Sequence, residues 1–102
     1  MRVISRKRLR KFWAVHPDAE AALRSWYKIV KNAAWNTPNE LAATLNGVDP
    51  VEVSSGNTVS VFNIARNKYR LIAHFHFDKQ RAFVLRVMTH REYDRKKWRD
   101  EL

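Results

Sequence analysis

Basic residues, a histidine and a tyrosine lie near the ends of two predicted strands late in the chain. Lys68 and Arg70 stand at the start of a strand with alternating apolar and polar residues, and His90 and Tyr93 follow the next strand. Adjacent antiparallel strands place the start of one beside the end of the other. We therefore expect these four side chains to meet at one end of a sheet.

Cleavage of RNA by its own neighbouring 2′-hydroxyl is the chemistry that this set suits. One group must take the hydroxyl proton, another must protonate the leaving 5′-oxygen, and fixed cations must stabilise the charge on the phosphorane. Histidine titrates near neutrality, so His90 is a candidate base or acid, with Tyr93 donating a proton or orienting the substrate. Arg70 and Lys68 are candidate clamps for the scissile phosphate. The reaction needs no metal and no cofactor, although the residues alone leave a solvated basic surface as the alternative.

The composition indicates a polyanionic partner. The 102 residues include 20 Lys and Arg against 10 Asp and Glu, which gives a net charge of +10. Residues 1–35 carry nine cations and two acids (+7), residues 36–65 carry three acids and no cation (−3), and residues 66–102 carry eleven cations and five acids (+6). A fold can gather the two basic ends into a surface that binds nucleic acid. A membrane surface or an acidic protein would also suit this charge.

One domain, residues 1–102, is expected, because a chain of this length buries a single core. The absence of cysteine excludes disulfides, a thiolate nucleophile and cysteine-ligated zinc. No stretch of 18 apolar residues occurs, and Arg10 and Lys11 interrupt the apolar residues of positions 9–15. We therefore predict a cytoplasmic protein with no membrane partner.

Two amphipathic helices are predicted in the first third of the chain, after a short strand at Arg2–Ile4. Ser5 is a candidate N-cap for the first helix, and Pro17 ends it because proline disfavours a helical residue before it. The second helix carries an apolar stripe at helical spacing, made of Ala22, Leu23, Trp26, Ile29, Val30 and Ala33. A capping box at Thr37–Glu40 then opens a short helix that stops near Asn46–Gly47.

From residue 49 onward the pattern changes to strands. Turn residues separate four runs rich in β-branched and aromatic side chains, at Val51–Val53, Val59–Ile64, Tyr69–Phe77 and Ala82–Met88. In the third run the odd positions are apolar and the even positions mostly polar, so one face packs on the helices and the other is expected to be open. Strands after two helices predict an α+β fold. The charged tail after Thr89 is either a short docked helix or a frayed end.

Several segments resemble the hallmark segments of HigB-type toxins of the RelE superfamily. They are Val61–Ile64, Asn67–Leu71 and Met88–Asp94, together with Arg2–Ser5, His16–Ala19 and Trp35–Pro38. The resemblance covers almost the whole chain in the right order. It implies a RelE-like α+β fold, in which a small twisted antiparallel sheet has two N-terminal helices packed on one face.

The resemblance also implies a function. Such toxins are ribosome-dependent endoribonucleases, or mRNA interferases, which enter the ribosomal A site, cut translated mRNA and inhibit translation. The implied partner is a HigA-type helix-turn-helix antitoxin, and operator DNA is bound only through that antitoxin. Two other functions stay open, namely a non-catalytic RNA- or ribosome-binding module that acts by occupancy and a degenerate toxin that acts mainly in the antitoxin–operator complex.

By position, the resemblance assigns functional residues to two motifs. Asn63, Asn67, Lys68 and Arg70 fall in the strand motif, and His90, Tyr93 and Asp94 fall in the C-terminal motif. Asp94 either orients one of the other two C-terminal residues or pairs with a nearby cation, Arg91 or Lys97. The resemblance favours orientation.

One position departs from the family pattern. Several members have an arginine five residues before the motif histidine, where this chain has Leu85. The nearest arginine is Arg86, and a shift of one residue turns a strand side chain to the opposite face. A two- or four-residue loop after Phe77 places odd positions of the last strand on the face of Arg70, whereas a three-residue loop or a bulge places Arg86 there. The sequence does not decide between them.

Basic residues and a histidine pair outside the catalytic motifs are further candidates for RNA contact. The first helix presents Arg6, Lys7, Arg10 and Lys11, which we expect to bind ribosomal RNA phosphates, a kind of contact that positions without reading sequence. This helix, or the sheet face, should also attract an acidic antitoxin segment. His74 and His76 share one strand face and either contact RNA or are solvated. No metal site is expected there, because no cysteine and no evident third ligand accompany them.

Overall fold

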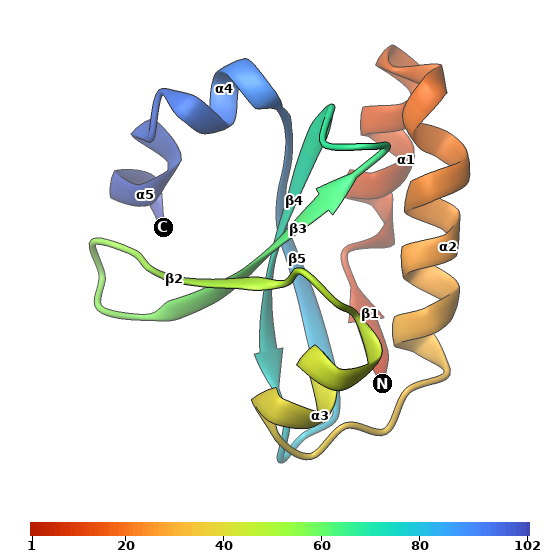
Figure 1. Cartoon of the computed structure of the whole chain (residues 1–102), viewed down its shortest axis with the longest axis vertical. Coiled ribbons are helices and arrows are strands. Elements are labelled where there is room, and N and C mark those ends of the chain that lie inside the picture. The colour runs from red at the N-terminus through yellow and green to blue at the C-terminus, as the bar shows by residue number, and fades with distance from the viewer.

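Five strands form a single sheet, with two long helices against one face and two short C-terminal helices over the other (Figure 1). The computed structural model describes residues 1–102. In chain order the elements are β1 (Arg2–Ile4), α1 (Arg6–Val15), the 3-10 turn η1 (Pro17–Ala19), α2 (Glu20–Lys31), α3 (Pro38–Thr44), β2 (Asp49–Glu52), β3 (Thr58–Ile64), β4 (Tyr69–His76), β5 (Arg81–Thr89), α4 (His90–Asp94) and α5 (Lys97–Glu101). None of the helices has the length and apolar content needed to cross a membrane.

The strand order is β1-β5-β4-β3-β2, with β4 in the centre. Strands β2 to β5 pair antiparallel in sequence order, and β1 joins the edge of β5 in a parallel pair. The predicted α+β class is confirmed, and the sheet is mixed rather than wholly antiparallel. β1 differs because its partner lies at the other end of the chain, so no hairpin forces the pair to be antiparallel.

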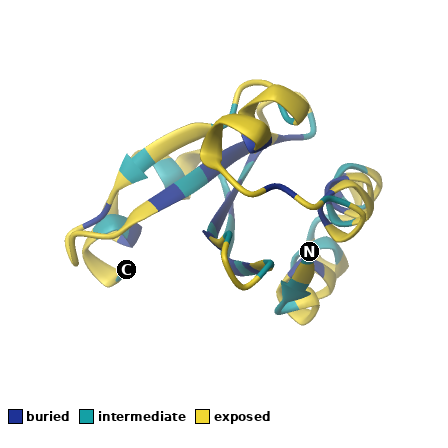
Figure 2. Cartoon of the chain, turned by 90° about the horizontal axis from the view of Figure 1, so that it is seen from below, coloured by how far each residue is buried: buried dark blue, intermediate teal, exposed yellow.

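Helices α1 and α2 form an antiparallel pair that covers one sheet face, with exposed residues along their outer sides (Figure 2). α1 ends at Val15, two residues before Pro17, as predicted. Ser5 precedes α1 but its side chain caps no backbone N–H, so the predicted cap is wrong. The apolar stripe of α2 buries Leu23, Trp26 and Val30 in one core with Phe62, Leu71 and Phe75 of the sheet. Burying each of these side chains contributes about 2 kcal/mol.

The short helix α3 begins where the capping signal predicts. The Thr37 side chain accepts a hydrogen bond from the Glu40 backbone N–H at 3.2 Å. The Glu40 carboxylate accepts from the backbone N–H of Asn36 at 2.7 Å, one residue before the position expected for a capping box. Gly47 has φ +81°, which turns the chain toward β2.

The second face of the sheet carries a smaller core. Val53, Val59, Val61, Ile72, Met88 and Trp98 are buried together, and Leu85, Tyr93 and Leu102 pack against them. The prediction that this face is open is therefore wrong at Ile72, which has no exposed surface. Ile72 interrupts the polar pattern of the even positions of β4, and an apolar side chain in the middle of a sheet needs a cover.

The C-terminal tail folds as two short helices and supplies that cover. Thr89 and Glu92 form a capping box at the start of α4, because each side chain accepts from the backbone N–H of the other at 3.2 Å. Lys96 takes a left-handed conformation, φ 60°, that turns the chain into α5. Trp98 is only 3% exposed, and its indole N–H donates to the Tyr93 carbonyl oxygen at 3.0 Å. The tail is docked, and the frayed-end alternative is wrong.

Replacing the buried indole tests whether the tail is docked in solution. We predict that Trp98→Ala lowers the free energy of unfolding by about 3 kcal/mol, because truncation of a buried tryptophan leaves a cavity. The control is Val15→Ala, since Val15 is 74% exposed and its truncation should change the free energy by less than about 0.5 kcal/mol. Urea-induced unfolding measures both variants, and equal effects would contradict the docked tail.

Candidate active site on the second sheet face

The loop between β4 and β5 is the four-residue alternative that the sequence left open. Residues 77–80 form this loop, and His76 pairs with Arg81 across it. Directly paired residues of antiparallel strands share one face of the sheet. This register therefore places odd positions of β5, near the loop, on the face that carries Arg70.

A β-bulge then reverses which residues of β5 face that side. Leu85 is the extra residue, because Val84 and Arg86 pair with consecutive residues of β4. Beyond the bulge the even positions share the face of Arg70, so Arg86 lies on it. Arg86 also forms an ion pair with Glu101 of α5, with Nη1 3.3 Å from Oε1.

Tyr93 and Arg70 form the centre of the candidate site. The guanidinium carbon of Arg70 lies 5.4 Å from the centre of the Tyr93 ring, a cation–π contact. The same ring stacks on Trp98, with centroids 5.2 Å apart and an interplanar angle of 19°. Arg70 Nη1 also donates to the carbonyl oxygens of Asn67 at 2.9 Å and Tyr69 at 3.1 Å. Both side chains are held in place, and the other guanidinium N–H groups remain free to bind an anion.

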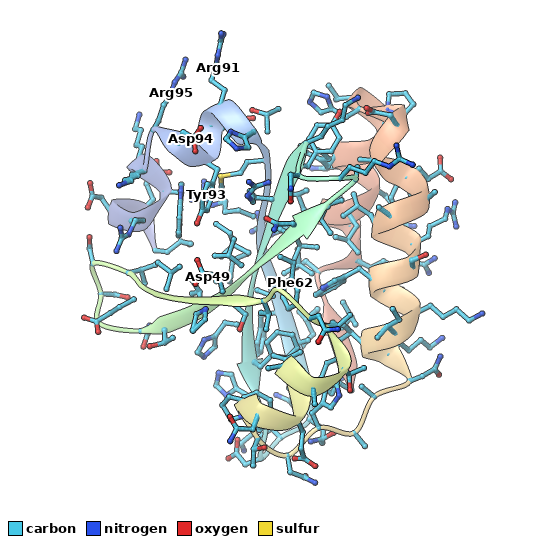
Figure 3. The ribbon with its side chains drawn as sticks, viewed as in Figure 1. Asp49, Phe62, Arg91, Tyr93, Asp94 and Arg95 are labelled. Atoms are coloured by element: carbon cyan, nitrogen blue, oxygen red, sulfur yellow. The ribbon has the colours of Figure 1, made fainter.

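The surroundings of Tyr93 favour its neutral phenol. Burial raises the pKa of Tyr93 above the ordinary 10.0, and the negative charge of Asp49 raises it further, whereas the positive charge of Arg70 lowers it. The phenol is therefore protonated at neutral pH and can donate a proton. Figure 3 shows Tyr93 on the side of α4 that faces the sheet, with Arg91 and Arg95 pointing away from the sheet.

His90 is the first residue of α4, and two contacts orient it. Its Nδ1 lies 2.7 Å from Asp94 Oδ2, and its backbone N–H donates to the carbonyl oxygen of Lys68 at 3.1 Å. Of the partners considered for Asp94, the structure shows His90, because residues four apart lie on one side of a helix. The two side chains are 52% and 59% exposed, so a substrate can reach the other ring nitrogen, Nε2.

The side chain of Lys68 contacts Asp18 and not the Arg70–Tyr93 pair. Lys68 Nζ lies 2.8 Å from Asp18 Oδ2, and the Tyr69 hydroxyl donates to Asp18 Oδ1 at 2.6 Å. These hydrogen bonds lower the pKa of Asp18, and the contact with Asp18 raises the pKa of Lys68 and of Tyr69. Asp18 thereby connects the corner between α1 and α2 to the start of β4.

The other strand residues expected to bind RNA lie along β4 and its neighbours. Asn63 pairs with Arg70 in the β3–β4 register, so its exposed side chain is on the same face. Asn67 contacts Arg70 through its backbone carbonyl oxygen. His74 and His76 have ring centroids 4.8 Å apart, and the strand rise puts them about 13 to 20 Å from Arg70. No group of three His, Cys, Asp or Glu residues is placed to hold a metal ion.

The basic helix α1 and the helix α4, which carries Tyr93, lie on opposite sides of the sheet (Figure 1). Lys7, Arg10 and Lys11 are exposed and form no ion pair. Arg6 differs, because its guanidinium lies 4.6 Å over the ring of Tyr27 in α2. The structure therefore brings Arg70, Tyr93, His90, Asp94 and Arg86 to one side of the sheet, while Arg8 and Lys11 of α1 line a hollow together with Arg86 and Glu92.

Three residues of this region escape prediction from the sequence. Trp98 is a single tryptophan in a charged tail, which is a weak sequence signal for burial. In the structure it is buried in the second core, and Tyr93 packs against that core. Asp49 affects Tyr93 only through the position of β2 beside β3. Asp18 lies 50 residues from Lys68, and no local pattern connects the two.

A basic α+β fold with a His–Asp pair, a neutral phenol and a fixed arginine on one sheet face is consistent with the RelE-like toxins that the sequence resembles. A model of the HigB toxin family, described as the RelE-like toxic component of a toxin–antitoxin system, matches residues 19–96. This match covers most of the chain, and the chain therefore belongs to the HigB toxin family.

Curated relatives agree with this assignment. The chain is 28% identical over 95 residues to the mRNA interferase HigB of Escherichia coli O6:H1, an alignment that covers 93% of this chain and 90% of the relative. It is 27% identical over 94 residues to the mRNA interferase toxin HigB of Escherichia coli K12 and to the mRNA interferase HigB of Shigella flexneri. These alignments cover 92% of this chain and 88% of each relative.

The contacts of Asp18 predict a pH-dependent contribution to stability. The pKa of Asp18 is lower in the folded protein than the ordinary 3.8, so the contribution is present above that pH and is lost as the pH falls through the folded-state value. We predict that Asp18→Asn lowers the urea midpoint at about pH 7 and that its difference from wild type shrinks as the pH falls below the ordinary pKa of 3.8. Glu20→Gln, which removes an exposed ion pair with Arg24, is the control. A difference that does not change with pH would contradict the role of the carboxylate.

Proposed function

We propose that this chain is a ribosome-dependent endoribonuclease, the mRNA interferase of a type II toxin–antitoxin system, which cuts translated mRNA and so inhibits translation. The observation that carries the proposal is the presence of the His90–Asp94 pair and the Arg70–Tyr93 pair on one sheet face. The names of the relatives, which are mRNA interferases, support the same activity.

In the proposed reaction, His90 takes the proton of the 2′-hydroxyl. Its Nδ1–H donates to Asp94, which fixes the tautomer that leaves Nε2 as a free acceptor. The 2′-oxygen attacks the adjacent phosphorus, and the bond between phosphorus and the 5′-oxygen breaks. The products are a 2′,3′-cyclic phosphate on one fragment and a 5′-hydroxyl on the other.

Tyr93 and Arg70 complete the proposed reaction. Tyr93 gives its proton to the leaving 5′-oxygen, because its raised pKa keeps the phenol protonated until that step. Arg70 stabilises the negative charge of the phosphorane, and its two backbone contacts hold it in place before the charge develops. Transfer of the proton from His90 to the phenolate, through solvent, restores both groups for the next cycle.

Further residues are proposed to hold the RNA on either side of the scissile phosphate. Arg86 lies on the same sheet face as Arg70 and forms an ion pair with Glu101. When it leaves Glu101 and binds a phosphate of the RNA instead, it adds a second cation to the site. Lys68 adds another by the same exchange with Asp18, since exposed ion pairs are weak. The residues proposed to contact flanking nucleotides are Asn63, Asn67, His74 and His76.

The proposed partners are the translating ribosome, its mRNA and a HigA-type antitoxin. Lys7, Arg10 and Lys11 of α1 are exposed cations without carboxylate partners, and we assign them to ribosomal RNA phosphates. Operator DNA is reached only through the helix-turn-helix antitoxin. The proposed location is the cytoplasm, where ribosomes translate.

Cleavage is tested by primer extension on a reporter mRNA after induction of the toxin. We predict new 5′ ends with the wild type and a cleavage rate lower by about 10²- to 10⁴-fold in His90→Ala and in Tyr93→Phe, because each removes a proton-transfer group. Arg91→Ala is the control, since Arg91 lies in the same helix and points away from the sheet (Figure 3). Growth arrest without new 5′ ends would contradict cleavage and favour a protein that blocks the ribosome by occupancy.

Ribosome binding is tested by sedimentation of the toxin with ribosomes at several salt concentrations. We predict that Lys7→Gln combined with Arg10→Gln weakens binding and makes its salt dependence less steep, by about one unit of logarithmic slope for each lost phosphate contact. Lys79→Gln, in the exposed loop between β4 and β5, is the control. If affinity and slope both stay unchanged, the cations of α1 bind another partner.

A further inference from the structure

The second sheet face contains a hollow at the end of β4 that lies away from α4 (Figure 1). The hollow has a volume of about 270 Å³. Three ring side chains line it together with one amide and four aliphatic side chains, namely His74, His76, Phe83, Asn57, Val53, Val59, Leu85 and Leu102. No acidic residue and no member of the His90–Asp94 or Arg70–Tyr93 pair lines it. The hollow is therefore separate from the groups that carry the proposed reaction.

The three rings of the hollow present aromatic surface to solvent. His76 is exposed, and His74 and Phe83 are partly exposed. The rings meet edge to face, with centroids 4.8 Å apart for His74 and His76 and 5.3 Å apart for His76 and Phe83. Among the Phe, Tyr and Trp residues of the chain, Phe83 is the only one that is neither part of a buried core nor packed against one. Its ring is therefore available to a ligand.

His74 adds a polar group of fixed character to this aromatic surface. Its Nδ1 lies 3.2 Å from the carbonyl oxygen of Thr58. Because a carbonyl oxygen only accepts, Nδ1 carries the proton, and the neutral ring leaves Nε2 as an acceptor. The amide of Asn57 both donates and accepts. A purely apolar ligand would cover these groups without pairing them, which is costly, so the hollow favours a ligand with a polar edge.

We propose that this hollow binds one unpaired base of the RNA substrate, stacked on His76 and Phe83 with its polar edge at His74. A nucleobase combines a flat ring with a hydrogen-bonding edge, and proteins bind unpaired bases by stacking them on Phe and His side chains. Arg81 pairs with His76 across the β4–β5 hairpin, is exposed and forms no ion pair. It supplies a cation for the phosphate of the bound nucleotide.

The position of the hollow on β4 relates this base to the scissile phosphate. His74 and His76 share the face of Arg70, and the strand rise puts them about 13 to 20 Å from it. Stacked nucleotides advance about 3.4 Å each, so the bound base lies about four to six nucleotides from the scissile phosphate, or fewer when the RNA is extended. The proposal rests on the proposed function, because it takes RNA as the ligand. It adds a contact that reads the presence of a base and holds the strand at a second point.

Binding of a short RNA, measured by fluorescence anisotropy, tests the proposal without any cleavage. The probe is a labelled, 2′-O-methylated RNA of about six nucleotides, which lacks the attacking hydroxyl and spans about 20 Å. The comparison probe is the same sugar–phosphate chain without bases. We expect the wild type to bind the base-bearing probe about fivefold or more tightly than the abasic probe. Phe83→Leu and His76→Ala should lose most of this preference, whereas His76→Phe should keep it, because a phenyl ring also stacks.

Phe77→Leu is the matched control for Phe83→Leu. Phe77 lies in the β4–β5 loop and packs against the core on the helix side, so its replacement should leave the preference unchanged. Urea-induced unfolding of each variant checks that it is folded, and His76→Ala changes an exposed side chain that the fold does not need. Equal binding of both probes by the wild type, a preference that survives in His76→Ala, or one that is lost equally in Phe77→Leu would overturn the proposal.

Primer extension with the same proteins reports cleavage independently. A preference for the base-bearing probe without cleavage would overturn the nuclease activity and leave the base site standing. Cleavage without that preference would overturn the base site alone.

Discussion

The burial of Trp98 holds the candidate site together. Its indole fills the core of the second sheet face, donates to the Tyr93 carbonyl oxygen and stacks on the Tyr93 ring. A helix of five residues such as α4 is not stable in water on its own. The positions of Tyr93 and His90 therefore depend on a side chain that takes no part in the proposed reaction.

Helices cover both faces of the central strand β4, and the surfaces of the protein on these two sides differ. On the helix side, the apolar stripes of α1 and α2 pack inward, so their cations face solvent on the outside of the molecule. On the other side, the small core leaves one end of β4 accessible around Arg70. The cations of a chain with net charge +10 therefore lie both around Arg70 and on the outer side of the helix pair, and Arg8 and Lys11 line a hollow with Arg86 between the two regions.

Backbone irregularities aim the side chains of the site. The bulge at Leu85 rotates the end of β5, and the turn at residues 65–67 has three consecutive positive φ angles, 53°, 57° and 69°. A left-handed residue other than glycine costs about 1 kcal/mol or more. This turn positions two backbone carbonyl groups of the site. The Asn67 carbonyl oxygen accepts a hydrogen bond from Arg70, and the Lys68 carbonyl oxygen accepts one from the backbone N–H of His90.

The amino-acid sequence by itself determined most of the helices and strands up to Thr89, the α+β class and the residues able to do chemistry. The break at Pro17, the cap at Thr37 and the apolar stripes are local signals, and they act whatever the rest of the chain does. Tertiary structure alone decided where the reactive side chains point. It moved Arg86 onto the active face, paired Lys68 with a distant carboxylate and placed Trp98 under the site. Periodicity records which side of an element is buried, whereas register and long-range contacts depend on packing that no local pattern carries.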